Sequence, residues 1–243
     1  MNNLFKPALR GFVTNVGTRN DAEREEWVKS TLSRLPAGIR LLDAGAGQQR
    51  YRRYCPQAVY VSQDFCQYTG GGDYQALQTG TWDTRAIDII SDIAAIPQPD
   101  GSFDVVLCTE VIEHVPDPLA ALREFRRLLR PGGELIITAP FCSVTHMAPY
   151  HFYSGFNRYF YERHLPTLGF TIKELVANGN YAEYTGQELR RLLAQYERMP
   201  FYARACVGAL LHFVGSCKSP GSRDSALVCY GYHVRAVKTI SGD

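Results

Sequence analysis

The feature that most constrains this chain is a short apolar stretch that ends in an acidic residue and two glycines. Leu41 and Leu42 lead into Asp43, and Gly45 and Gly47 follow two positions apart. Such a run is typical of a buried parallel strand. Glycine is needed where the next turn requires a positive φ or brings the backbone close to a ligand. The stretch therefore predicts a strand and a tight turn beneath a nucleotide-like ligand. Because glycine-rich turns are common, the order of the following segments decides how this one is interpreted.

Strand-like and helix-like segments alternate after this point. Apolar spacing predicts a helix over residues 20–35 and a second one that begins at Pro118 and is stopped by residues 131–133. Short apolar runs predict strands at residues 39–42, 59–61, 89–90, 103–108 and 134–139, with a late strand within 226–237. The alternation implies an α/β fold with a doubly wound, mainly parallel sheet.

Length and composition fit one globular domain. The chain has 243 residues, of which 45% are hydrophobic and 21% charged, so we expect a single domain over residues 1–243. Its formal net charge of +2 gives no reason to expect nucleic acid or an anionic membrane as a partner. No apolar run reaches the length of about 18 residues that a spanning helix needs. Residues 1–6 lack a signal-peptide core, and seven cysteines without C-x-x-C spacing indicate no disulfide framework, so we expect a cytoplasmic protein.

Three further motifs follow the glycine turn in order. They are Asp64 just after the second strand, the pair Asp92 and Ile93 after the third, and the stretches 103–115 and 128–133 around the fourth strand and the next helix. With these motifs, residues 38–141 resemble the class I S-adenosylmethionine-dependent methyltransferases. The resemblance implies an enzyme with a seven-stranded Rossmann-like sheet and S-adenosylmethionine as its cofactor.

The resemblance also implies roles for individual residues. The cofactor-binding core would be residues 38–141, and the residues expected to contact the methyl donor are Asp43, Gly45, Gly47, Asp64, Asp92, Ile93 and Glu110. A carboxylate at Asp64 suits the two ribose hydroxyls, which are hydrogen-bond donors. Residues 48–50 after the turn supply no third glycine, so a pyrophosphate loses part of its cradle. This departure favours the methyl donor over NAD, although an NAD-dependent oxidoreductase stays an alternative.

Histidines after the fifth strand are the candidate catalytic groups. Methyl transfer to a hydroxyl benefits from a general base, because an alcohol is a poor nucleophile. His114, His146 and His151 are the candidates, and the last two lie among aromatic residues at the expected mouth of the cleft. Against this interpretation, a histidine in a loop often serves only as a hydrogen-bonding residue.

A metal-assisted reaction is the main alternative to histidine base catalysis. Glu110, Glu113 and His114 form an E-x-x-E-H pattern. The pattern resembles that of metal-using methyltransferases acting on ubiquinone-type catechols or on the terminal ribose of small RNAs. Two carboxylates and an imidazole suit Mg²⁺ or Mn²⁺. The same pattern resembles members without a metal, so we assign no metal ligand. The arginines at 50–53 and 123–130 are expected to be solvated, and we expect no nucleic acid partner.

The remaining segment is expected to select the acceptor. Residues 142–225 are predicted to form a helical and aromatic elaboration that binds the acceptor, and Thr185 with Glu188 matches a capping box at a helix start. Aromatic surfaces with polar tips suit sugar rings and flat rings. We therefore expect O-methylation of a small molecule or saccharide. A catalytically inactive cofactor-binding module and a metal-assisted RNA ribose methyltransferase remain alternatives, and the oligomeric state is left open.

Overall fold

The computed structural model describes residues 14–68, 70, 77, 80, 82–196, 198–217 and 222–240. The start of the chain, where we expected no signal peptide, lies outside the described residues. Seven strands form one sheet in the order β3-β2-β1-β4-β5-β7-β6. The strands are β1 (Arg40–Ala44), β2 (Val59–Asp64), β3 (Ile89–Ile90), β4 (Phe103–Thr109), β5 (Leu129–Pro140), β6 (Phe170–Asn178) and β7 (Gly231–Lys238).

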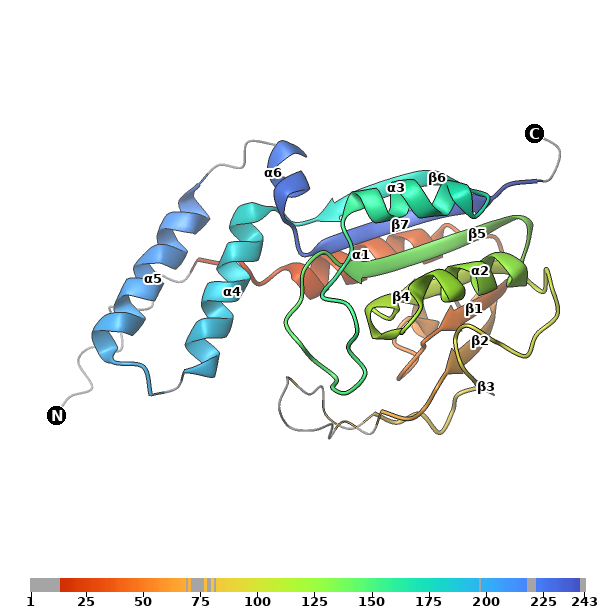
Figure 1. The fold of residues 1–243 in the computed structure, drawn as a ribbon, viewed down its shortest axis with the longest axis horizontal. Helices are drawn as coiled ribbons and strands as arrows, with labels where there is room; N and C mark the ends of the chain where they lie inside the picture. Colours follow the sequence, from red (N-terminus) through yellow and green to blue (C-terminus); the bar gives the residue numbers. More distant parts are fainter. Residues whose placement is uncertain are drawn as a thin grey trace. The chain divides into compact units, whose positions relative to one another are not determined.

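Six α-helices and two short 3-10 turns accompany these strands in the described part of the chain (Figure 1). They are α1 (Asn20–Ser33), η3 (Arg52–Tyr54), η4 (Ile112–His114), α2 (Pro118–Leu128), α3 (Arg158–Thr167), α4 (Tyr181–Gln195), α5 (Phe201–Ser216) and α6 (Ser222–Leu227). Among the residues that the structure describes, no helix is both long enough and apolar enough to cross a membrane.

The sheet is parallel over its first five strands. β1 pairs in parallel with β2 and β4, β2 with β3, and β4 with β5. β7 pairs antiparallel with β5, from Glu134 opposite Val237 to Pro140 opposite Gly231. The expected seven-stranded, mainly parallel α/β sheet is therefore confirmed. Because parallel strands share a direction, the carboxyl ends of β1, β2, β3, β4 and β5 meet at one edge, where open α/β sheets bind ligands.

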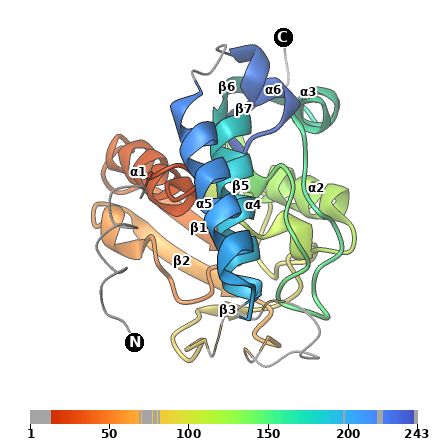
Figure 2. The same ribbon diagram turned by 90° about the vertical axis from the view of Figure 1, so that its left-hand side faces the viewer.

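Helices cover both faces of the sheet. Figures 1 and 2 show α1 on one face and α2 and α3 on the other. On the first face, Val28 and Leu32 of α1 are fully buried against Leu41 of β1. On the second, Leu122 and Phe125 of α2 are fully buried. Burial of apolar surface at about 25 cal/mol per Å² is the main stabilising term for such layers.

The predicted α2 begins as expected and ends earlier than expected. Asp117 caps it by accepting a hydrogen bond from the Ala120 amide at 2.9 Å, and Pro118 occupies the first turn. The helix ends at Leu128, and the glycines that we expected to stop it lie inside β5 instead. They form a bulge, since Phe103 pairs with Leu129 whereas Val105 pairs with Glu134.

The chain divides into two compact units. The first comprises residues 1–23 and 177–230, and the second comprises residues 24–176 and 231–243. The second holds the sheet, so residues 142–176 of the predicted elaboration belong with the sheet by their contacts. The functional division into a cofactor core (38–141) and an acceptor-binding elaboration (142–225) stays a prediction.

The smaller unit is built around a pair of helices. Val207 and Leu211 of α5 pack with Val16, and Leu189 and Leu193 of α4 adjoin them. The α4 helix starts at Tyr181, one turn before the predicted capping box. Asn180 is its cap, because its side chain accepts a hydrogen bond from the Glu183 amide at 3.0 Å. The predicted strand within 226–237 begins only at Gly231, because residues 222–227 form α6.

Candidate active site

A cavity of about 820 Å³ opens at the carboxyl edge of the sheet. Its walls come from the turn after β1, the ends of β2, β3 and β4, and the long loop after β5, together with Arg24 of α1. Eight of the ten site residues predicted from the sequence line it: Gly45, Gly47, Asp64, Asp92, Ile93, Glu110, His114 and His146. The parallel topology therefore gathers residues that are far apart in the sequence.

The glycine turn fits the cavity only without side chains. Gly45 has φ +75°, and a Cβ there would lie 2.5 Å from a methyl group of Val111. Gly47 has φ +50°, and a Cβ there would lie 2.6 Å from the ring of Trp82. The amides of Gly45 and Ala46 both donate to the Gln63 carbonyl at 2.9 Å. The turn is therefore tied to the end of β2 and passes close to its neighbours.

Asp64 is held in place by the backbone. One carboxylate oxygen accepts from the Gly47 amide at 2.9 Å, and the other accepts from the Cys66 amide at 2.8 Å. The residue is 5% exposed. A carboxylate oxygen can accept about two hydrogen bonds, so each oxygen retains capacity for a ligand hydroxyl. The carboxylate is thus oriented before any ligand arrives.

Gln63 links the glycine turn to the end of β3. This buried side chain accepts from the Gly45 amide at 3.3 Å and donates to the Ser91 carbonyl at 2.7 Å. Next to Ser91, Asp92 is exposed and accepts from the Ala94 amide at 2.8 Å, while Ile93 is buried. The positions of Asp92 and Ile93 therefore depend on a glutamine that sequence reasoning missed, because a single glutamine in a strand forms no motif.

Glu110 lies on the cavity wall in a left-handed backbone conformation, with φ +54°. This conformation is uncommon for a residue with a side chain. Its carboxylate accepts from the Thr138 hydroxyl at 2.9 Å and forms an ion pair with the Arg24 guanidinium at 3.1 Å. Arg24 is the second functional residue that sequence reasoning missed. It lies in α1, far from every motif in the sequence.

Three histidine rings meet beside the cavity. The ring of His146 lies 4.7 Å from that of His114 and 4.6 Å from that of His151, measured between centroids. Nδ1 of His114 lies 2.5 Å from the Tyr150 carbonyl, and Nδ1 of His146 lies 3.0 Å from the Val144 carbonyl. A carbonyl oxygen only accepts, so each Nδ1 carries a proton. In the neutral rings, Nε2 is therefore an unprotonated acceptor.

Burial keeps His114 neutral. The pKa of His114 is lowered to about 4, mainly by burial and in smaller part by the neighbouring His146. Burial also lowers the pKa of His151, with His146 again contributing. Nε2 of His151 lies 3.2 Å from the Ser143 hydroxyl, which donates its own proton to the Ser154 carbonyl. His151 does not line the cavity, although its ring lies 4.6 Å from that of His146.

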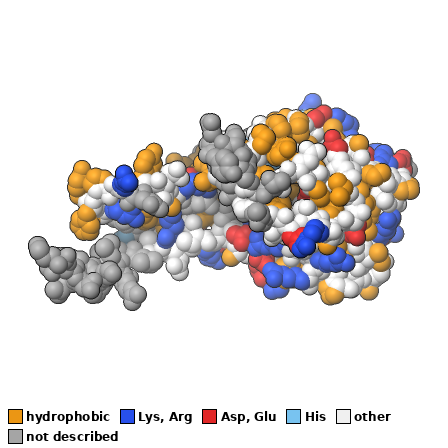
Figure 3. All heavy atoms as spheres, turned by 90° about the horizontal axis from the view of Figure 1, so that it is seen from below, with side chains coloured by type: hydrophobic (Ala, Val, Ile, Leu, Met, Phe, Trp, Pro, Cys, Tyr) orange, Lys and Arg blue, Asp and Glu red, His pale blue; other side chains and the backbone are white. Residues whose placement is uncertain are grey.

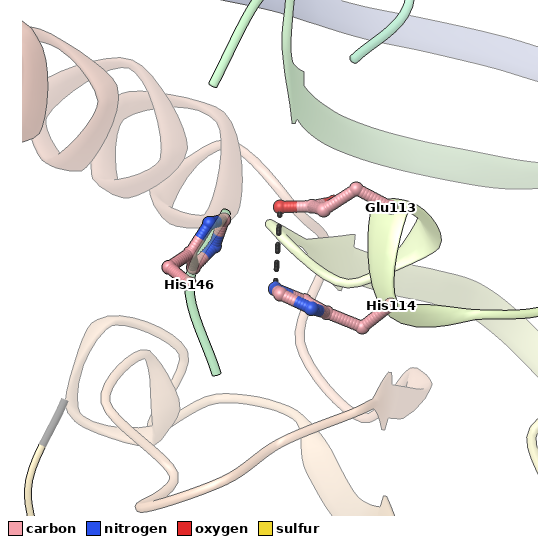
Figure 4. A group of neighbouring side chains, drawn as sticks. All are labelled: Glu113, His114 and His146. Atoms are coloured by element: carbon pink, nitrogen blue, oxygen red, sulfur yellow. Dashed lines mark ion pairs between the residues drawn. The ribbon is translucent and has the colours of Figure 1, made fainter. Parts of the chain in front are cut away.

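Glu113 completes a cluster with two of these histidines (Figure 4). Ligand atoms of Glu113, His114 and His146 all lie within 4.8 Å of one another, and Nε2 of His114 is 3.7 Å from the Glu113 carboxylate. Glu113 is 1% exposed, and within the described residues neither of its carboxylate oxygens has a hydrogen-bond partner. Burial and the nearby Glu110 charge raise the pKa of Glu113 well above its usual range.

A family model described as a methyltransferase domain matches residues 42–137. This match spans the glycine turn, the cavity-lining ends of β2 to β4 and most of β5, within the sheet order given above. Residues 42–137 therefore match a methyltransferase domain. The resemblance seen in the sequence motifs is confirmed.

Relatives with curated names match part of the chain. The ubiquinone biosynthesis O-methyltransferase of Xanthomonas axonopodis pv. citri is 34% identical over 121 residues, which are 47% of this chain and 48% of that protein. The protein of the same name from Vibrio parahaemolyticus is 44% identical over 63 residues, 26% of each chain. The chain thus spans about half, or less, of the length of these curated relatives.

Solved structures share the fold of the methyltransferase domain. The [4+2]-cyclase SpnF has a TM-score of 0.57 at 17% identity and covers 93% of this chain and 84% of its own. Phosphoethanolamine N-methyltransferase 2 of Haemonchus contortus, solved with S-adenosyl-L-methionine, has a TM-score of 0.52 at 17% identity, covering 90% and 53%. At these identities the likeness shows the fold alone, and this fold serves more than one chemistry.

Two of the predicted site residues, Asp43 and His151, do not line the cavity. Asp43 is buried at the end of β1, where its carboxylate accepts a hydrogen bond from the Tyr60 hydroxyl. Burial raises the pKa of Asp43 to about 7, and the Asp64 charge adds to the rise. The geometry of Asp43 fits support of the strand that carries the glycine turn.

Proposed function

We propose that this chain transfers the methyl group of S-adenosylmethionine to an oxygen atom of a small molecule. The observation that carries the proposal is a single cavity with a glycine turn and a preoriented Asp64 on one side and two unprotonated histidine nitrogens on the other. The relatives named ubiquinone biosynthesis O-methyltransferase support oxygen as the acceptor atom.

The donor side fits S-adenosylmethionine by its chemistry. A Cβ at Gly45 or Gly47 would collide with Val111 or Trp82, so the turn has room only for backbone beside the ligand. Asp64 offers hydrogen-bond acceptors for the ribose hydroxyls. Asp92 and Ile93 would flank the adenine. The Glu110–Arg24 ion pair presents opposite charges to the ammonium and carboxylate groups at the amino-acid end of the donor. When bound, the donor supplies an electrophilic methyl group: a C–O bond forms as the C–S bond breaks, and the electron pair of that bond stays on sulfur.

The acceptor side contributes a base and a positioning residue. Nε2 of His146 or His114 takes the hydroxyl proton of the acceptor as the oxygen attacks. Burial lowers the pKa of His114 to about 4, which makes His114 a weak base, so we assign the role of base to His146. His151 acts as a positioning residue by packing on the His146 ring at 4.6 Å. Phe65, Trp82, Tyr150 and Phe152 also line the cavity, which suits a flat aromatic or sugar ring.

Calorimetric titration with S-adenosylhomocysteine tests the donor site. We expect binding in the micromolar range, about −8 kcal/mol. Asp64→Asn should weaken it by about 1.5–3 kcal/mol, the value of a charge-assisted hydrogen bond. Asp100→Asn, at an exposed acid that pairs with Arg127, is the matched control and should bind like wild type. If the chain binds NAD but not S-adenosylhomocysteine, the proposal is refuted and an oxidoreductase function is favoured.

An acceptor screen tests the reaction itself. With an active acceptor, His146→Ala should lower kcat by about 10²–10⁴-fold and leave the affinity for S-adenosylhomocysteine unchanged. His151→Ala should lower kcat less than His146→Ala does, because the proposed base, His146, is still present. Full activity of His114→Ala and His146→Ala together would refute base catalysis by these residues. Donor binding without turnover of any catechol, phenol or saccharide would favour a regulatory module. Affinity for RNA that falls steeply with salt would favour a nucleic acid acceptor.

Metal-assisted O-methylation is a second candidate, favoured by the Glu113 cluster. A buried carboxylate with two unpartnered oxygens beside two unprotonated imidazole nitrogens fits a divalent cation. Glu113, His114 and His146 would hold it, and a bound Mg²⁺ or Mn²⁺ would supply Lewis-acid polarisation of the acceptor hydroxyl. The residues that would hold the metal are also the candidate bases, so the two mechanisms make different predictions for Glu113.

Direct metal binding separates the two candidates. Electron paramagnetic resonance of Mn²⁺ titrated into the purified chain reports bound metal without any activity measurement. If the cluster is a metal site, wild type binds Mn²⁺ and Glu113→Gln does not, while both bind S-adenosylhomocysteine. If the histidines act only as a general base, neither wild type nor Glu113→Gln binds Mn²⁺, and both samples give the signal of free Mn²⁺. Glu110→Gln serves as a control for loss of charge on the cavity wall.

A further inference from the structure

Helix α5 is apolar on the side that faces solvent. Its exposed residues include Phe201 and Tyr202 at 70% and 73% exposure, Leu210 at 50% and Phe213 at 67%. These four side chains are named here the outer face of α5. In Figure 3, hydrophobic side chains project from this helix at the left of the view, with basic side chains between them. A helix on a protein surface normally carries polar residues on its solvent side.

The inner side of α5 is already packed. Val207 and Leu211 are buried with Val16, and Leu189 and Leu193 of α4 adjoin them. Packing within the smaller unit therefore accounts for one side of the helix only. Large apolar side chains that lie together on a surface often mark an interaction site, so the outer face calls for an apolar partner of its own.

The charges around the helix identify the kind of partner. Between Glu197 and Asp224 the sequence has no acidic residue and four basic ones, Arg198, Arg204, Lys218 and Arg223. Arg198 and Arg204 are exposed, and the Arg204 guanidinium donates to the Leu193 and Tyr196 carbonyls of the neighbouring segment at 3.4 Å and 3.5 Å. The whole chain has a formal net charge of only +2, so the overall composition conceals this local excess of positive charge. Exposed aromatic residues with flanking cations are typical of helices that lie on anionic membranes.

We propose that the outer face of α5 docks on the surface of an anionic lipid bilayer. At 16 residues the helix is shorter than the about 20 residues that a span requires. It would therefore lie in the plane of the interface. Phe201, Tyr202 and Phe213 would enter the boundary between headgroups and acyl chains, and Arg198 would contact lipid phosphates. The smaller unit is thereby a peripheral membrane anchor.

Vesicle flotation of the full chain tests the proposal. The probes are vesicles of phosphatidylglycerol mixed with phosphatidylcholine, and vesicles of phosphatidylcholine alone. Wild type should float with the anionic vesicles, and binding should weaken as salt is raised. Phe201→Ser combined with Phe213→Ser should lower the partition coefficient by at least about tenfold, since each substitution removes an aromatic ring that the bilayer would bury. Tyr159→Ser, at a 69% exposed residue of α3, is the matched control and should float like wild type.

Each other outcome overturns the proposal. Absence of wild type from both vesicle fractions rules out lipid docking, and equal flotation with neutral vesicles rules out the anionic surface. If the double variant floats like wild type, α5 is not the anchor. Light scattering completes the test: a dimer of wild type that the double variant loses, without flotation, would assign the outer face to a second copy of the chain. Circular dichroism and binding of S-adenosylhomocysteine confirm that the double variant is folded.

Discussion

Replacing Gly45 by alanine tests whether the first turn of the cavity depends on the lack of a side chain. At φ +75° an alanine is strained by about 1–2 kcal/mol. The new Cβ would also lie 2.5 Å and 2.6 Å from the two γ-methyl groups of Val111. Overpacking of this kind costs about 1–3 kcal/mol. Gly45→Ala should therefore lower the free energy of unfolding by about 2–5 kcal/mol.

Gly132 provides a control with the same backbone angle and no neighbour. Its φ is also +75°, and nothing lies within 4 Å of the position that its Cβ would take. Gly132→Ala should thus cost about 1–2 kcal/mol from backbone strain alone. The difference between the two variants measures the contact with Val111. In Gly45→Ala with Val111→Ala the contact is relieved, so part of the loss should be recovered.

Urea unfolding followed by circular dichroism measures both free energies, and titration with S-adenosylhomocysteine measures the donor site. Gly45→Ala should also bind the product more weakly, because the turn must move to admit the methyl group, whereas Gly132→Ala should bind it normally. Equal stabilities of the two variants, within about 0.5 kcal/mol, would refute the close approach of Val111. A double variant that is less stable than both single variants would do the same.

Three further predictions concern a helix cap and two buried titratable groups. Asn180→Ala should destabilise α4 by about 1 kcal/mol and Thr185→Ala by less than about 0.5 kcal/mol, measured by urea unfolding; the reverse order would restore the capping box at Thr185. Burial lowers the pKa of His233 to about 3, so below about pH 6.5 the unfolded chain binds a proton there that the folded chain does not, and stability falls. His233→Gln should lose about 2 kcal/mol less than wild type between pH 7 and pH 5, and equal losses would contradict this. The pKa of Asp43 is raised to about 7, so ionisation destabilises the fold as pH rises from about 4 to 7. Asp43→Asn should therefore gain about 2–3 kcal/mol relative to wild type between pH 5 and pH 8, and a constant difference would show that the carboxyl ionises normally.

Most of the sheet could be predicted from the sequence because its central strands are continuous apolar runs. β1 and β4 are largely buried, and each contains a short apolar run, Leu41–Leu42 in β1 and residues 105–108 in β4. β6 was missed. Its side chains alternate and many are only half buried, and Lys173 and Glu174 interrupt the apolar pattern. Apolar and polar residues alternate only over residues 170–173, which is too short a signal to predict a strand.

The α4 boundary was predicted one turn too late for a local reason. Thr185 and Glu188 match a capping box, but Asn180 precedes them and accepts from the Glu183 amide. Gly186 lies inside α4, where glycine is intrinsically unfavourable. The structure explains this glycine by packing, because a Cβ there would lie 3.0 Å from Val16. Tertiary contact outweighs intrinsic helix propensity at this position.

Within the candidate site, residues at strand ends were predictable and residues on other elements were not. Asp64 follows directly from its place after β2. Arg24 lies in α1 and reaches Glu110 only through the packing of that helix on the sheet. Gln63 carries no motif, and its two hydrogen bonds appear only in the folded turn. Glu113 was predictable as part of a pattern, but its unpartnered carboxylate depends on burial.

The position of β7 in the sheet has a consequence for biosynthesis. β7 fills the place between β5 and β6, yet it is translated after both of them. Until residues 231–238 leave the ribosome, the nascent chain presents the edge of β5 without the strand that pairs with Leu135, Ile136 and Ile137. An apolar strand edge of this kind invites pairing with other chains. Closure of the sheet must therefore await synthesis of β7, and the interval before it is when the nascent chain most needs protection by a chaperone.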